Sequence, residues 1–127
     1  MEACLVLKFF QRETSKEQYP IEEIISKLSH KPDDSWEQES SRGFGYERRF
    51  YTPYIEEEIT SFLEWGLSIQ EEVGLALGHH DAEFLVAIYT NGQVNPGIHI
   101  SYHALQLLNK LYAELDFDIY AIDGNEQ

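Results

Sequence analysis

The sequence predicts a single α+β domain, in which a mixed, largely antiparallel sheet of about 4–5 strands packs against three helices as a two-layer sandwich. Two observations lead to this class. Segments with a period of two alternate along the chain with segments whose apolar residues recur every three or four positions. Asn91-Gly92, between two apolar segments, is a type I′ turn signal that predicts a hairpin and hence antiparallel pairing. A chain of 127 residues is long enough for one hydrophobic core and too short for two, so one domain is expected over 1–127.

The first half of the chain predicts two strands and a short helix. Residues 3–10 alternate with apolar side chains on both faces, which is typical of a strand inside a sheet. Residues 20–28 open with a proline, which suits the first turn of a helix, and continue with apolar residues at helical spacing. Residues 44–51 alternate again as a strand. The polar segment 30–45 predicts a loop with a short strand around Trp36, and this side chain either anchors the loop to the core or contacts a partner; anchoring is favoured because an exposed tryptophan promotes unspecific association.

The middle of the chain predicts a long helix. Thr52-Pro53 is a start signal, in which an N-cap residue precedes a proline at the first helical position. One apolar stripe continues through 55–77, and Gly78 ends the segment. Ser68 opens a capping-box pattern, Ser-Ile-Gln-Glu, so a second helix is expected to start there if the first one is interrupted.

The last third predicts a hairpin, a helix and a closing strand. Residues 82–90 are rich in β-branched and aromatic residues, and turn signals after them lead into a short strand at 98–100. The closing strand after Leu115 alternates between apolar and mostly acidic residues, which predicts one buried and one exposed face. Its apolar face is Phe117, Ile119 and Ala121, and its other face is Asp116, Asp118 and Tyr120. The stripe of the helix before it consists of Ala104, Leu105, Leu108, Leu111, Tyr112 and Leu115.

The charge balance narrows the classes of partner. Asp and Glu total 23 against 9 for Lys and Arg, which gives a net charge of −14 and a pI near 4.5. Such a surface repels nucleic acid and anionic membranes, because both are bound chiefly through Lys and Arg. It attracts a basic protein and accelerates their encounter at low salt. The alternative is that the acidity serves solubility alone.

A cytoplasmic location is expected. The longest apolar segment is far shorter than the roughly 18 residues that a membrane span requires. The N-terminal stretch lacks the basic residues and the cleavage site of a signal peptide. Cys4 is the single cysteine, so no internal disulfide is expected, and its place in a predicted strand favours a buried apolar role over that of a nucleophile.

No catalytic motif is present, so a non-enzyme without a cofactor is expected. His79, His80 and Asp81 form a compact trio that keeps a metal- or small-ligand-binding protein open as an alternative, although solvated loop histidines are the favoured interpretation. Asp116 and Asp118 share one face of the closing strand at about 7 Å, a spacing that suits acid–base catalysis or a divalent cation. The favoured explanation is an outward acidic face that discourages pairing at a sheet edge.

Several motifs carry a resemblance to a known family. They are the helix PIEEIISKLS, the turn Pro32-Asp33-Asp34-Ser35-Trp36, the middle helix, and a final strand, turn and helix that end in LDFDIY at Leu115 to Tyr120. With these, the chain resembles over most of its length the bacterial family catalogued as domain of unknown function 4279. Glu37-Gln38-Glu39 departs from the basic residue and the glycine that often follow the tryptophan in that family. The resemblance implies the fold and a bacterial origin, and it transfers no catalytic residues because the family has no assigned activity.

Together these observations favour a small, non-catalytic protein-binding module, such as an immunity-type inhibitor of a basic toxin. The expected contact surface is Asp33, Asp34, Trp36, Glu37, Glu39, Tyr54, Glu56 and Glu57. Two alternatives stay open. One is the metal or small-ligand site around His79 and His80, and the other is a homodimeric structural protein held by a sheet edge or a helix face. Whether the chain is a monomer or a homodimer is left open with them.

Overall fold

A computed structural model of the chain describes residues 2–12, 19–51, 53–90 and 98–121. Within these residues it contains a five-stranded sheet and three helices, which confirms the predicted α+β class. In chain order the elements are β1 (Glu2–Arg12), α1 (Ile21–Ser26), β2 (Asp34–Glu37), β3 (Ser41–Tyr51), α2 (Ile55–Leu77), β4 (Asp81–Thr90), α3 (Tyr102–Leu111) and β5 (Ala113–Ala121). Among the helices of this part, none combines the length and the apolar character that crossing a bilayer demands.

The strands form one sheet in the order β2-β3-β1-β4-β5, with β1 at its centre. β1 pairs antiparallel with β3 and β4, and β2 pairs antiparallel with β3, whereas β4 and β5 run parallel. The predicted hairpin after β4 is therefore wrong. Residues 98–100 form no strand, and α3 carries the chain across to β5, because parallel neighbours require a long crossover. The turn signals within 91–97 lie outside the described residues.

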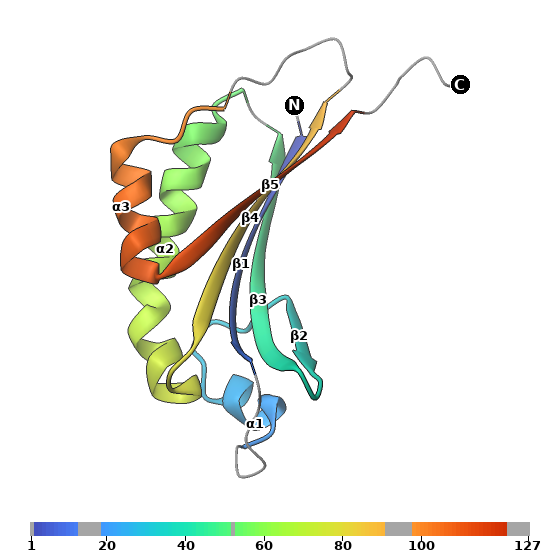
Figure 1. The fold of residues 1–127 in the computed structure, drawn as a ribbon, viewed down its shortest axis with the longest axis vertical. Helices are drawn as coiled ribbons and strands as arrows, with labels where there is room; N and C mark the ends of the chain where they lie inside the picture. The colour runs from blue at the N-terminus through green and yellow to red at the C-terminus, as the bar shows by residue number, and fades with distance from the viewer. Residues whose placement is uncertain (1, 13–18, 52, 91–97, 122–127) are drawn as a thin grey trace, which may run out of the picture.

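Helices cover only one face of the sheet (Figure 1). Alternate residues of β1 point to that face, and Leu5, Leu7 and Phe9 are completely buried there beneath α2 and α3. The opposite face carries no helix in the part of the chain that the structure describes (Figure 1). We call it the open face. It consists of the even-numbered residues of β1, β2 and β5 and the odd-numbered residues of β3 and β4, as the pairing register shows.

α2 is one continuous helix of 23 residues. The Ser68 hydroxyl donates to the Trp65 carbonyl at 2.5 Å instead of capping a second helix. A single buried stripe runs along the whole helix, so both halves gain from packing on the same sheet and no break is needed. The helix begins at Ile55 with Tyr54 at the N-cap position, two residues beyond the predicted start at Pro53.

The last helix and strand follow the predicted order but differ in burial. On α3, Leu107 is buried although the predicted stripe omits it, whereas Leu105 and Tyr112 are 50% and 81% exposed. On β5, Phe117 and Ile119 point to the helix-covered face and are still 39% and 54% exposed. β5 is the last strand of the sheet, so the predicted half-buried strand is uncovered along its outer side.

Gly66 allows direct contact between α2 and β1. A Cβ atom at this position would overlap the Cδ2 atom of buried Leu7, so a residue without a side chain lets the two elements approach this closely. Gly74 lies further along the same helix, and a Cβ atom there would come no closer than 4.0 Å to a neighbour, the Cε1 atom of His80. The two glycines therefore differ in what surrounds them.

We predict that Gly66→Ala leaves the protein less stable than Gly74→Ala does. Alanine has a higher helix propensity than glycine, so both changes stabilise α2 by about 1 kcal/mol on this account. Only Gly66→Ala overpacks the core against Leu7, which costs about 1–3 kcal/mol. Urea unfolding should give Gly74→Ala a free energy of unfolding at or above that of the parent protein, and Gly66→Ala a value about 1–3 kcal/mol below that of Gly74→Ala. Equal gains from both changes would show that α2 is not held against β1 at this position.

Candidate functional site

The open face is acidic along β4 and β5. Glu83 on β4 lies directly opposite Glu114 on β5, and Asp116 and Asp118 continue the row along β5. We call Glu114, Asp116 and Asp118 the β5 acids; all three are exposed. The strand rise separates successive β5 acids by about 7 Å. Neither they nor Glu83 form an ion pair with any other residue that the structure describes.

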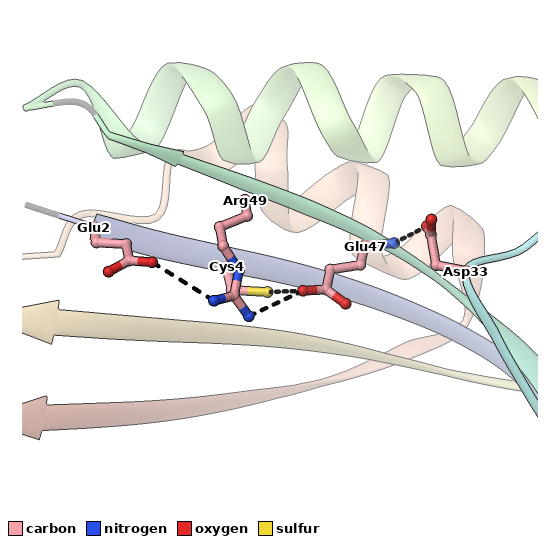
Figure 2. Close-up of polar contacts among 5 residues, drawn as sticks. All are labelled: Glu2, Cys4, Asp33, Glu47 and Arg49. Atoms are coloured by element: carbon pink, nitrogen blue, oxygen red, sulfur yellow. Dashed lines mark hydrogen bonds and ion pairs between the residues drawn. The ribbon is translucent and has the colours of Figure 1, made fainter.

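Arg49, on the β1–β3 half of the open face, is already used within the fold (Figure 2). The Arg49 guanidinium lies 3.2 Å from the Glu47 carboxylate and 3.6 Å from that of Glu2. The Cys4 thiol donates a hydrogen bond to the same Glu47 carboxylate at 3.1 Å. This hydrogen bond, assisted by Arg49, holds the pKa of Glu47 below its usual range. The carboxylates of Glu2 and Glu47 are therefore offset by a cation, unlike the β5 acids.

Cys4 is buried, with 5% of its surface exposed, as the strand pattern predicts. Burial first, and the hydrogen bond to the Glu47 carboxylate second, raise the pKa of the Cys4 thiol to about 11. The thiolate is the nucleophilic form of cysteine. A thiol with this pKa stays protonated near neutral pH, so Cys4 is suited to packing and not to nucleophilic catalysis.

The predicted contact surface divides into two places in the structure. Five of its residues lie on or beside β2, at the sheet edge opposite β5: Asp33, Asp34, Trp36, Glu37 and Glu39. Two of their carboxylates serve the fold. Asp33 Oδ2 accepts a hydrogen bond from the Glu47 backbone N–H at 2.8 Å (Figure 2), and Glu37 lies 3.6 Å from the buried Arg42 guanidinium.

Trp36 anchors β2 to the sheet, as the favoured interpretation of this residue predicts. Its ring lies on the open face beside Phe10, with 6.3 Å between the ring centroids, and beneath the Lys8 ammonium group at 5.8 Å. Its indole N–H donates to the Ser41 hydroxyl at 2.9 Å. The side chain is half-buried and leaves only part of its surface to a partner.

The other predicted contact residues, Tyr54, Glu56 and Glu57, lie at the start of α2. β3 separates them from β2, because β2 pairs with the first residues of β3 and α2 follows its last residue. At about 3.3 Å per residue, the length of β3 between β2 and the start of α2 is roughly 25 Å. The eight residues therefore lie in two groups, one beside β2 and one at the start of α2, and their contact with a partner stays a prediction. Sequence proximity to Trp36 gave no indication of which acids share a face.

An open cleft of about 390 Å³ lies between β3, α2 and the segment 29–33 that follows α1. Trp65 stacks on Phe62 with 5.7 Å between centroids and meets Tyr46 edge-on at 5.0 Å. The lysine and the arginine at its rim already have partners. Arg48 lies 3.8 Å from a Glu58 carboxylate oxygen, and the Lys31 ammonium group donates to carbonyl groups at and just after the end of α1. The cleft has the volume of a small-ligand site. Sequence reasoning missed it because nothing in the sequence links Trp65 to an aromatic residue on β3.

In the trio His79, His80 and Asp81, the last two side chains make contacts that stabilise the local structure. The His80 ring packs edge-on against Phe9 with 5.6 Å between centroids, and Asp81 lies 3.9 Å from the Arg12 guanidinium. Among the described residues, no group of three or more His, Cys, Asp or Glu side chains is placed to hold a metal ion. The alternative of a metal site at His79, His80 and Asp81 therefore gains no support from the geometry.

No family model matches the chain, and searches of curated proteins and of solved structures return no match. The resemblance to domain of unknown function 4279 stays an expectation based on its motifs.

We predict that Cys4 makes the protein less stable as the pH rises above about 9. The folded state keeps the thiol protonated to about pH 11, whereas the unfolded chain releases this proton near its ordinary pKa of 9.0. The unfolded state then binds fewer protons, so the free energy of unfolding falls with pH, by about 1 kcal/mol between pH 8.5 and pH 10.

The measurement is urea unfolding under reducing conditions from pH 7.5 to pH 10. Above pH 8.5, the free energy of unfolding of Cys4→Ala should fall less steeply than that of the parent protein. Below pH 8.5, the two free energies should differ by a constant amount. Tyr46 acts as an internal reference. Burial raises its pKa to about 12, so its own contribution begins near pH 10 in both proteins. Parallel pH profiles for the parent protein and Cys4→Ala would contradict the assignment.

Proposed function

We propose that this protein is a non-catalytic binding module that engages a basic protein through the acidic part of its open face. The observation that carries the proposal is the row of the β5 acids. None of the three forms an ion pair within the described chain, whereas Glu83 beside them has Lys8 of β1 as its opposite neighbour. A complementary partner gains association rate and specificity from such a row.

The placement of these acids favours binding over solubility as their purpose. Glu114, Asp116 and Asp118 follow one another on one face of β5, where like charges repel. Lys8 lies opposite Glu83 and offsets its charge, but no cation lies opposite the β5 acids. Solubility requires net charge, which dispersed carboxylates provide without this cost. Cations of a partner, in contrast, relieve the repulsion when they bind.

An immunity-type inhibitor of a basic toxin is the specific form of this function that we propose. The chain is small, its net charge is −14, and the β5 acids lie on the face that carries no helix in the described part of the chain. A toxin whose active surface is cationic presents the complementary charge, and covering that surface inhibits it without any chemistry by the inhibitor.

We predict that neutralising the β5 acids abolishes capture of a basic partner. The parent protein and the variant Glu114→Gln/Asp116→Asn/Asp118→Asn are immobilised and exposed to lysate of the source cell at low and at high salt. The parent should retain a basic protein at low salt and release it as salt rises, because screening weakens charge pairing. The variant should retain at least about tenfold less of it.

The matched control is Glu22→Gln/Glu23→Gln/Glu71→Gln. It removes the same charge from exposed helix positions on the other side of the molecule. This control should bind as the parent does. Equal retention by the two triple variants would show that only net charge matters, and retention of no basic protein by the parent would refute the proposed function.

A further inference from the structure

The outer edge of β5 offers free backbone hydrogen-bonding groups. β5 is nine residues long and pairs with β4 along its inner edge, and no strand of the described chain pairs with its outer edge (Figure 1). A strand edge presents a row of N–H and C=O groups that accept an additional strand. β5 contains no proline or lysine, and the charged side chains that protect this edge are the β5 acids, which repel an acidic strand and attract a basic one.

Apolar side chains border this edge on the helix-covered face. Phe117 and Ile119 lie opposite Val86 and Ile88 of β4, both of which are completely buried. Phe117 and Ile119 are nevertheless 39% and 54% exposed, because the sheet ends beside them. Another strand would cover them.

Leu105 extends this apolar border onto α3. His103 on the same helix lies 3.0 Å from Glu64 of α2. Successive helical residues are rotated by about 100°, so Leu105 is about 200° from His103 and points away from α2. α3 contacts α2 on one side and also contacts β5. The half-exposed Leu105 side chain therefore lies on the side of the free edge.

The two faces of β5 thus differ in chemistry, with the β5 acids on the open face and exposed apolar residues on the other. We propose that the edge of β5 receives an extended strand of the partner in which Lys or Arg alternates with apolar residues. Its cations lie opposite the β5 acids, and its apolar residues pack against Phe117, Ile119 and Leu105. This inference rests on the proposed function and specifies how the basic partner binds.

The same charges disfavour a second copy of this chain as the occupant. Two β5 strands that continue one sheet in antiparallel pairing place their open faces on the same side. The β5 acids of one copy then lie among those of the other, and directly opposed like charges are destabilising. A basic strand replaces this repulsion with attraction.

The test uses an acetylated and amidated peptide, Lys-Val-Lys-Ile-Lys-Val-Lys-Val, titrated into the isotope-labelled protein and followed by NMR. We predict binding at one peptide per chain, signal changes concentrated in β5 and α3, and slower amide exchange in β5. A peptide of the same composition with its lysines in one block should bind at least about tenfold more weakly, because it cannot present cations and apolar groups on opposite faces.

Variants separate the charged face from the apolar face. Asp116→Lys should weaken binding of the lysine peptide about tenfold and strengthen binding of the matching peptide that carries Glu in place of Lys. Ile119→Ser should weaken the lysine peptide about fivefold. The control Glu71→Lys makes the same charge change at an exposed position of α2 and should alter affinity less than about twofold.

Two outcomes would overturn strand addition. The first is that the block peptide binds as tightly as the alternating one, or that the alternating peptide does not bind although the β5-acid variant still loses the lysate partner. The partner then uses the acidic face without adding a strand, and the proposed function stands. If light scattering shows a mass of two chains that Phe117→Ser reduces to one, the edge is occupied by a second copy. Retention of no basic protein from the lysate bears on the proposed function, whereas the peptide results bear on strand addition.

Discussion

The direct contact of α2 with β1 is the constraint on which the other features of this structure depend. β1 occupies the centre of the sheet, and its residues Leu5, Leu7 and Phe9 are completely buried on the helix-covered face. Gly66 lets α2 approach Leu7 without a side chain between them. Because α2 takes this central position, α3 lies to one side of it and the sheet extends past the cover that α3 provides. The exposed outer side of β5 follows from this arrangement.

The uneven distribution of charge is a second consequence of the fold. Antiparallel pairing places Arg49 of β3 across from Cys4 of β1, within reach of Glu47 and Glu2, so cations and anions neutralise one another in that half of the open face. β5 joins the sheet at the other edge and presents three acids and Tyr120, but no cation, on its open face. Part of the acidic charge of the chain is therefore concentrated, without cations beside it, at one sheet edge.

Residues that suggest chemistry in isolation are used here for packing and local order. His80 packs against Phe9, and Cys4 is buried with a raised pKa. Trp36 fastens β2 to the open face through Phe10. Each of these contacts gives a structural reason for a residue that would otherwise be a candidate ligand, nucleophile or partner contact. The β5 acids are different, because none of them forms an ion pair within the described chain, and Asp118 accepts only a long hydrogen bond of 3.4 Å from the Tyr120 hydroxyl.

The sequence by itself determined the α+β class, the interior character of β1, the long helix α2 and the anchoring of Trp36, because periodicity and local signals act over a few residues. Only the tertiary structure decided that β4 and β5 run parallel, that the predicted contact acids separate into two places, and that Leu105, Phe117 and Ile119 stay exposed. Strand order decides these features. It depends on pairing between residues far apart in the chain, and a local pattern of apolar and acidic residues is the same at the centre of a sheet as at its edge.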